Sequence, residues 1–309
     1  MKTAYIFPGQ GSQKVGMGKE FFEREPGSRA VFEAADCALG FELSRLCFEG
    51  PEEELKLTAV TQPAVLTTSV AILTAVEERV GPPDFVAGHS LGEYTALVAA
   101  GSLGFEDGVS LVQERGRFMQ EAVPAGAGAM AAVMGGGLEA IAGSCREASS
   151  RGVCSIANIN APGQIVIAGH RNAVEYAAEL LRSRGAKRVI LLAVSAPFHC
   201  ELMAPAGERL SPLLDNTKFL DLKTPLVTSV DADVILSGGQ ARDSLKRQVA
   251  SPVRWTDSVS RLIAEGVERF VEIGPGKVLS GLVKQIDGTV ETVSIQSLEA
   301  LEAALTASV

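Results

Sequence analysis

A serine stands between two glycines at the point where an apolar segment gives way to a helical pattern. Residues 85–87 (Phe-Val-Ala) are short and apolar, as expected of a buried strand, and they run directly into Gly88-His89-Ser90-Leu91-Gly92. Residues 93–100 then favour a helix. The two glycines allow a sharp turn that presents the Ser90 hydroxyl at the N-terminus of that helix. Strand, turn and helix in this order predict an α/β fold with Ser90 as a candidate nucleophile.

The segments before and after this motif favour the same alternation of strands and helices. Residues 4–7 form an apolar run stopped by Pro8-Gly9, which predicts a buried strand followed by a tight loop. Apolar side chains recur at three- and four-residue spacing over residues 62–79 and predict a helix. Beyond residue 197, we expect strands at 225–230 and 269–273, helices at 240–248 and 277–286, and a short surface helix at 297–309.

The middle of the chain follows a different order. Four expected strands and two expected helices alternate there as βαββαβ, which is the order of a ferredoxin-like unit. The strands are expected at 129–134, 153–158, 164–168 and 188–194, and the helices at 138–149 and 173–184. We therefore expect a large α/β domain with a parallel sheet, formed by residues 1–123 and 198–309, interrupted by a ferredoxin-like small subdomain at 124–197.

Composition excludes several classes of function. A hydrophobic fraction of 46% over 309 residues is enough to bury a sizeable core, and a net charge of −9 argues against a nucleic-acid partner. The sequence has no run of about 18 or more apolar residues, so we expect no membrane span. The apolar run that precedes Pro8 is too short for the hydrophobic core of a signal peptide. The five cysteines form no CxxC pair. These features predict a cytoplasmic protein with reduced thiols and no metal site.

A serine hydroxyl needs a base to take its proton, and the chain has three histidines. His89 adjoins Ser90, but neighbouring side chains on a tight turn point apart, so we interpret it as a packing residue beside the site. His170 follows the expected strand at 164–168 and is interpreted as a loop histidine. His199 lies where the chain leaves the small subdomain and follows the serine in sequence, as in α/β-hydrolases. His199 is the predicted base.

Nearby residues leave alternatives open for the other members of the site. Asp231 and Asp233 follow the expected strand at 225–230 and could supply the acid of a Ser-His-Asp triad. Cys200, next to His199, could be a thiol nucleophile, but sequence neighbours seldom face each other, so an incidental thiol is favoured.

Five segments of the chain occur in an order that is shared with a known family. They are Phe7-Pro8-Gly9-Gln10-Gly11-Ser12-Gln13, Gly88-His89-Ser90-Leu91-Gly92-Glu93-Tyr94, Asn160-Ala161-Pro162-Gly163-Gln164, His199 and Glu272-Ile273-Gly274-Pro275-Gly276. Together they resemble the malonyl-CoA:acyl-carrier-protein transacylase family, which loads malonyl groups for fatty-acid synthesis. The resemblance covers nearly the whole chain and implies a hydrolase-like α/β domain interrupted by a ferredoxin-like subdomain.

The resemblance implies a role for each residue of the reaction centre. Ser90 would attack the malonyl thioester to form an acyl-enzyme, with His199 as general base and then general acid. The backbone N–H groups of Gln10 and Leu91 would form the oxyanion hole. The main-chain carbonyl of Gln248 would orient the histidine, which gives a dyad rather than a triad.

The resemblance also implies how the substrate is recognised. Gln10 and Arg115 would bind the substrate, and Arg115 would pair bidentately with the malonyl carboxylate. A buried guanidinium left unpaired would penalise acetyl-CoA, so the same residue would reject as well as bind. From the residues alone, Arg115 is one of two arginines on an expected helix and would be interpreted as a solvated surface residue. Phe198 departs from bacterial stand-alone members, which often have a small polar residue there, and bears on the breadth of acyl groups accepted.

The partners implied are malonyl-CoA and an acyl carrier protein, with no cofactor and a monomeric enzyme. The alternatives are a trans-acting malonyl acyltransferase of polyketide synthesis, a serine thioesterase, and an inactive scaffold or nucleotide-binding module. The last is disfavoured because Lys14 stands where a dinucleotide loop beginning Gly9-x-Gly11 needs its third glycine. Because a carrier protein is typically acidic, it would need a local basic patch, for which the candidates are Lys187, Arg188, Lys277 and Lys284.

Overall fold

The computed structural model describes residues 1–194 and 196–306, and its larger sheet has six strands in this part of the chain. Their order is β10-β9-β1-β2-β7-β8, and all neighbours are parallel except the pair β7 and β8. The strands are β1 (Lys2–Phe7), β2 (Phe85–Gly88), β7 (Leu226–Val227), β8 (Val234–Ile235), β9 (Val267–Ile273) and β10 (Glu291–Ile295). The predicted α/β class with a parallel sheet is confirmed.

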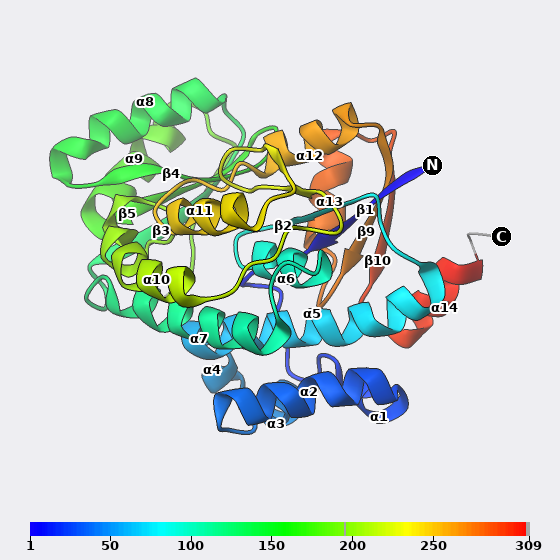
Figure 1. The fold of residues 1–309 in the computed structure, drawn as a ribbon. Helices are drawn as coiled ribbons and strands as arrows, with labels where there is room; N and C mark the ends of the chain where they lie inside the picture. Colours follow the sequence, from blue (N-terminus) through cyan, green and yellow to red (C-terminus); the bar gives the residue numbers. More distant parts are fainter. Residues whose placement is uncertain (195, 307–309) are drawn as a thin grey trace.

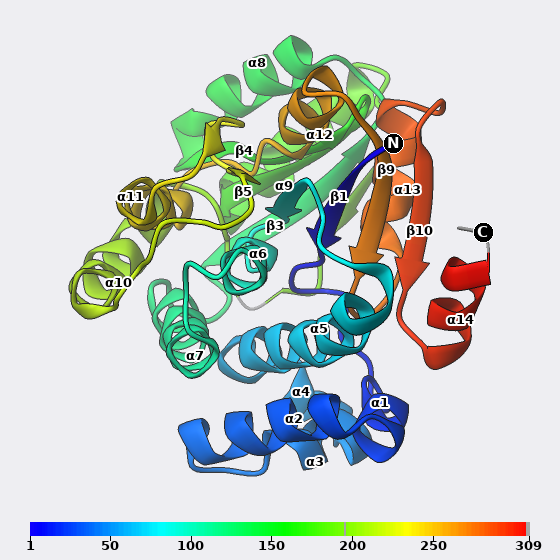
Figure 2. The same cartoon turned by 45° about the vertical axis from the view of Figure 1, so that its right-hand side comes forward.

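Helices cover both faces of this sheet (Figure 2). Alternate side chains of β1 point to opposite faces, as the pleat of a strand requires. Tyr5 and Phe7 join the core under α5 (Thr58–Val80) and α6 (Gly92–Ala99), whereas Ala4 and Ile6 join the core under α12 (Trp255–Ala264) and α13 (Val278–Ile286). Residues 4–7 and 85–87 are buried between the two layers of helices, which explains why these two runs of the sequence are continuously apolar.

The remaining helices of the large part pack outside this sandwich (Figure 1). Four helices near the N-terminus lie against the outer side of α5, and a fifth packs along α5. The other three lie beyond that fifth helix or beside the edge strand β10. In chain order, these helices are α1 (Lys19–Arg24), α2 (Pro26–Leu39), α3 (Leu43–Glu49), α4 (Glu52–Leu55), α7 (Phe105–Glu121), α10 (Ala204–Asn216), α11 (Gly238–Gln248) and α14 (Leu298–Thr306).

The middle of the chain forms a second, antiparallel sheet with the order β4-β5-β3-β6. Its elements are β3 (Gly128–Met134), α8 (Leu138–Ala148), β4 (Cys154–Ala161), β5 (Gln164–His170), α9 (Arg171–Ser183) and β6 (Arg188–Leu191). The two helices and the sheet share a separate apolar core. The βαββαβ order is confirmed, and the domain boundaries at 123/124 and 197/198 stay a prediction.

The two sheets are joined at one point that matters for the site. Asn158 of β4 pairs with Val253, the Ile159 N–H donates to the Val253 carbonyl at 2.8 Å, and the Val253 N–H donates to the Ala157 carbonyl at 2.9 Å. These bonds hold the small sheet beside the segment that follows α11.

Some predicted elements differ from the structure. The strand expected at 225–230 was wrong in length: β7 ends at Val227 because the chain turns back at once into β8, with the Ala232 N–H donating to Thr228 at 3.1 Å and Ala232 at a φ of 59°. The strand expected at 188–194 ends at Leu191. The tail helix ends at Thr306, and residues 307–309 of that expectation lie outside the described residues.

One helix has the length and composition of a membrane span. Residues Thr58–Glu77 of α5 have a mean hydropathy of 1.5, but 83% of that window is buried inside the protein. Buried core helices pass the same test of length and hydropathy, so this feature is weak evidence for a span.

Candidate active site

The serine motif forms a tight elbow between β2 and α6. Ser90 adopts a φ of 54°, in the left-handed region that non-glycine residues rarely occupy. A Cβ on Gly88 would lie 1.9 Å from the backbone carbon of Gly92, and a Cβ on Gly92 would lie 2.0 Å from the Phe7 carbonyl oxygen. Both positions therefore require glycine, and the elbow lifts the Ser90 side chain off the end of the strand.

Ser90 and His199 lie within hydrogen-bonding distance. The Ser90 Oγ is 2.7 Å from the His199 Nε2. The His199 Nδ1 is 3.1 Å from the carbonyl oxygens of both Gln248 and Ser251, so it carries the proton and leaves Nε2 as the acceptor. Burial and the positive charge of Arg115 lower the pKa of His199 to about 3, which keeps the ring neutral and able to accept the serine proton.

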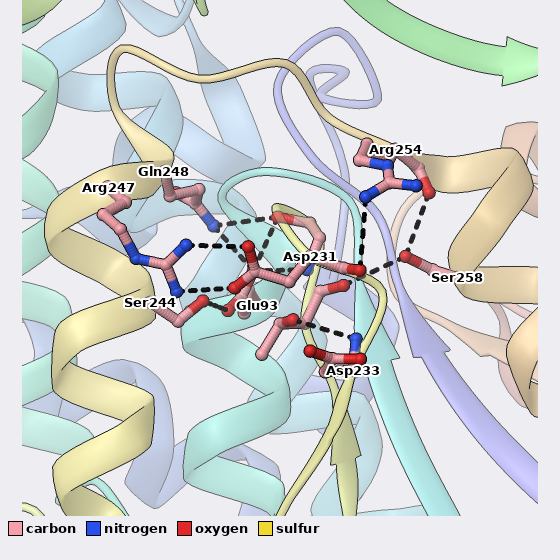
Figure 3. Close-up of polar contacts among 10 residues, drawn as sticks. Glu93, Asp231, Asp233, Ser244, Arg247, Gln248, Arg254 and Ser258 are labelled. Carbon is pink, nitrogen blue, oxygen red and sulfur yellow. Dashed lines mark hydrogen bonds and ion pairs between the residues drawn. The ribbon is translucent and has the colours of Figure 1, made fainter.

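No carboxylate among the described residues bonds to His199. The Asp231 carboxylate accepts two hydrogen bonds from Arg247, at 2.7 and 2.5 Å (Figure 3). Asp233 lies 3.8 Å from Arg261. Both aspartates are held by arginines away from the histidine. Two main-chain carbonyls occupy the place that an acid takes in a Ser-His-Asp triad.

The other two histidines and the neighbouring thiol do not reach Ser90. His89 pairs its Nε2 with Asn160 Oδ1 at 2.9 Å and packs against Trp255, and burial lowers its pKa. His170 Nδ1 accepts from the Val153 N–H at 2.9 Å. The Cys200 thiol donates to the Pro197 carbonyl at 3.0 Å, and burial raises its pKa to about 11.

Arg115 lies at the centre of the site rather than on the surface. Its side chain on α7 is 1% exposed, so the interpretation from residues alone as a solvated arginine was wrong. Its guanidinium donates to Gln62 Oε1 at 2.8 Å, to Gln248 Oε1 at 2.9 Å and to Ser90 Oγ at 3.1 Å. The Nε atom has no acceptor among the described residues. Because Nη2 lies beside the Ser90 hydroxyl and Arg115 lines the cavity, the guanidinium can bind an anionic group there in place of a present acceptor.

A cavity of about 290 Å³ opens onto this cluster. It is lined on its polar side by Gln10, Gln62, Ser90, Arg115 and His199, and on its apolar side by Leu91, Met119, Met130, Leu192, Val194 and Phe198. Both parts of the protein line the cavity: Ser90 and Arg115 belong to the large part, and Met130 belongs to β3 of the small sheet. Among the described residues, no group of three His, Cys, Asp or Glu side chains could hold a metal ion.

Gln10 and Leu91 both line this cavity, and neither backbone N–H has a hydrogen-bond acceptor in the described part of the chain. The loop of Gln10 approaches the elbow closely, since a Cβ on Gly9 would lie 2.5 Å from the His89 carbonyl oxygen and the His89 N–H donates to the Phe7 carbonyl at 3.1 Å. Unpaired donors at such an elbow are suited to an oxyanion.

The structure brings together Gln10, Ser90, Leu91, Arg115, His199 and Gln248, which the sequence singled out. Sequence reasoning missed Gln62 and Glu93. Gln62 opens the apolar stretch of α5, and Glu93 begins the apolar helix α6. A polar side chain on the buried face of an apolar helix is the signal that could have revealed both residues.

Comparison with known proteins places the chain in a family. The acyl transferase domain model matches residues 4–300. The chain is 50% identical over 305 residues to a malonyl CoA-acyl carrier protein transacylase of Bacillus subtilis, covering 98% of this chain and 96% of the relative. It is 48% identical over 303 residues to the enzyme of the same name of Escherichia coli K12, covering 98% of each.

Solved structures agree over the same length. An acyl carrier protein S-malonyltransferase from Vibrio cholerae superimposes with a TM-score of 0.96 at 45% identity, covering 98% of this chain and 100% of the other. A chain from a complex of a type II polyketide acyl-carrier protein with its malonyl-transacylase superimposes with a TM-score of 0.97 at 43% identity, covering 99% and 100%. These structural similarities also confirm the predicted fold class. The chain therefore belongs to the malonyl CoA-acyl carrier protein transacylase family of acyl transferases.

Proposed function

We propose that this chain transfers a malonyl group from malonyl-CoA to the phosphopantetheine thiol of an acyl carrier protein through an acyl-enzyme on Ser90. The observation that carries the proposal is the position of one guanidinium: Arg115 Nη2 lies 3.1 Å from the Ser90 Oγ, which is itself 2.7 Å from His199 Nε2. A serine–histidine pair acylates itself with an ester or thioester. A buried arginine beside it selects an acyl group that carries its own carboxylate.

In the first half-reaction, His199 Nε2 takes the proton of Ser90 as Oγ attacks the thioester carbon. The negative charge that develops on the carbonyl oxygen is stabilised by the N–H groups of Gln10 and Leu91. Collapse of this intermediate breaks the C–S bond, and the CoA thiolate leaves with the proton that His199 carried. The product is a malonyl ester on Ser90.

In the second half-reaction, the neutral His199 takes the proton of the carrier thiol, whose sulfur attacks the ester carbon. The same two N–H groups stabilise the intermediate, and the C–O bond breaks as Oγ recovers its proton from His199. The two half-reactions balance without a cofactor, because each consumes one acyl bond and forms another.

Arg115 gives the reaction its preference for malonyl. The malonyl carboxylate can accept hydrogen bonds from the guanidinium and from the side-chain NH2 group of Gln10 at the cavity wall. An acetyl group brings no anion, so the buried charge of Arg115 stays without a charged partner in the transition state. Met119, Met130 and Phe198 form an apolar wall of the cavity, and packing against this wall sets the length of acyl chain that the cavity accepts.

The carrier is expected to be that of fatty-acid synthesis, with a polyketide carrier as the alternative. That the enzyme acts as a monomer in the cytoplasm stays a prediction. Lys187, Arg188, Lys277 and Lys284, the candidates for a basic docking patch, are all exposed. Charge reversal at these positions should raise the KM for the carrier and leave the KM for malonyl-CoA unchanged.

The proposal is tested by incubating the enzyme with malonyl-CoA and a phosphopantetheinylated carrier, and quantifying malonyl-carrier and free malonate. Malonyl-carrier should be the main product, and intact-mass spectrometry should detect a malonyl adduct on the enzyme when the carrier is omitted. Free malonate as the main product would show a thioesterase instead. An enzyme that forms no adduct at all would contradict acyl transfer.

A further inference from the structure

Glu93 is a fully buried carboxylate that the reaction described above does not use. It is 0% exposed and lies on the first turn of α6, three residues after the nucleophile. It accepts from the Ser229 N–H at 3.1 Å, the Ser229 hydroxyl at 2.6 Å, the Ser244 hydroxyl at 3.1 Å and the Gln248 amide at 2.9 Å (Figure 3). A buried carboxylate with this many donors is fixed in one orientation.

The Gln248 side chain connects this carboxylate to the arginine of the site. Its Nε2 donates to Glu93 Oε2 and to the Ser90 carbonyl oxygen at 3.0 Å, while its Oε1 accepts from Arg115 Nη2 at 2.9 Å. A carboxylate can only accept and a guanidinium can only donate, so the two charged neighbours allow a single orientation of the amide between them.

The intervening amide has a chemical consequence. A carboxylate in direct contact with Arg115 would form a buried ion pair and occupy the donors that the substrate needs. With Gln248 in between, the Glu93 carboxylate stays close, Arg115 has no carboxylate partner among the described residues, and its Nη2 is directed at the Ser90 hydroxyl. The arginine is thus held in place but left able to bind an anion.

We propose that Glu93 is a positioning residue for malonyl selection: by fixing the Gln248 amide, it holds the Arg115 guanidinium beside Ser90 in the orientation that receives the acyl carboxylate. The inference rests on the proposed function. It predicts that the bond from Gln248 to Glu93 Oε2 affects the choice between malonyl and acetyl. The His199 ring is held by main-chain carbonyls, so the same bond has less effect on the rate of acylation itself.

The test compares kcat/KM for malonyl-CoA and for acetyl-CoA in three variants. Glu93→Met removes the acceptor at similar volume and should lower the malonyl/acetyl ratio by about 10- to 100-fold, because the Gln248 amide next to Arg115 loses its charged acceptor and keeps only the Ser90 carbonyl and the Ser229 hydroxyl. Glu93→Gln should keep most of the ratio, since its amide oxygen can replace Oε2 and its amino group can donate to Ser244. Ser244→Ala, which removes a donor to the other carboxylate oxygen, is the matched control and should keep the wild-type ratio.

Gln248→Met removes the same bond from the other side, together with the bonds of the amide to Arg115 and to the Ser90 carbonyl, and keeps the main-chain carbonyl. It should lower the ratio as Glu93→Met does, and the double variant should be no worse than either single one. This variant decides the matter if Glu93→Met does not fold.

Two results would overturn the inference: a wild-type ratio in Glu93→Met or Gln248→Met, or a ratio in Glu93→Gln as low as in Glu93→Met, which would assign the effect to charge alone. Failure of the proposed function is distinguishable, because it would appear in the wild-type enzyme as the absence of a malonyl adduct.

Discussion

The guanidinium of Arg115 donates a hydrogen bond to the hydroxyl of Ser90, at 3.1 Å between Nη2 and Oγ. The residue proposed to select the acyl group and the proposed nucleophile are therefore in contact. Under the proposed function, a malonyl carboxylate would accept this hydrogen bond in place of the serine oxygen.

Replacement of Arg115 by alanine should affect malonyl transfer and acetyl transfer differently. We expect malonyl transfer to fall by about 100-fold or more, because a charged hydrogen-bonded pair is lost from a buried site, while acetyl transfer stays similar or rises. Steady-state kinetics with both thioesters measures this. Arg117→Ala is the control, since Arg117 is half exposed and pairs with Glu114 and Glu121 at the surface. An unchanged malonyl/acetyl ratio in Arg115→Ala would refute the carboxylate role.

Replacement of Ser90 by alanine should abolish the acyl-enzyme. Radiolabelled malonyl-CoA should leave no label on the denatured protein, whereas the wild type should retain about one label per chain at saturation. Cys200→Ser is a useful companion, because its thiol is bonded to Pro197 and should not contribute to labelling. Label that persists in Ser90→Ala would assign the nucleophile elsewhere.

The pH dependence of acylation should reflect the lowered pKa of His199, which burial and the Arg115 charge bring to about 3. The neutral base is present above that pKa, so the rate of acetyl-enzyme formation should be nearly flat from about pH 5 to about pH 8, without the acid limb near pH 6.5 of an ordinary histidine. In Arg115→Ala, one of the causes that lower this pKa is removed, so the acid limb should move to higher pH. Quenched single-turnover experiments with acetyl-CoA give both profiles, and a wild-type limb centred near pH 6.5 would contradict this account.

Asparagine at positions 231 and 233 should leave catalysis intact. The Asp231 carboxylate is held by Arg247 and Asp233 lies near Arg261, so neither orients the base. We expect kcat within about twofold of the wild type, where loss of a triad acid costs about 10⁴-fold. A large fall in kcat at unchanged stability would show that one of these aspartates acts as the acid of a Ser-His-Asp triad.

Alanine at Gly88 should destabilise the protein as well as inactivate it. The added Cβ would meet the backbone of Gly92 at 1.9 Å, and backbone cannot move aside as a side chain can. We expect a loss of about 3 kcal/mol in the free energy of unfolding, measured by chemical denaturation. Gly137→Ala is the matched control, because nothing lies within 4 Å of its Cβ position. Equal stabilities of the two variants would show that the elbow tolerates a side chain.

The sequence predicted those parts of the fold in which the local pattern decides the structure. The strand at 85–88, the helix that follows it and the βαββαβ order of the small sheet could be predicted because alternation of apolar runs and turns is a local signal. The length of β7 could not, because it is set by its antiparallel partner β8. Ser90 and His199 were accessible through motif and chain order. Glu93 was not, because its importance depends on Ser229, Ser244 and Gln248, which lie more than 130 residues away and meet it only in the folded chain.

The His199 ring takes its orientation from main-chain oxygens of Gln248 and Ser251. Every amino acid carries that carbonyl, so no single codon change can delete the atom that does this work. Where an aspartate fills the role, one substitution removes it. A substitution at position 248 therefore keeps the carbonyl and removes only the side-chain amide, which contacts Arg115, Glu93 and the Ser90 carbonyl. The activity of variants at this position should thus separate what the amide contributes from what the carbonyl contributes.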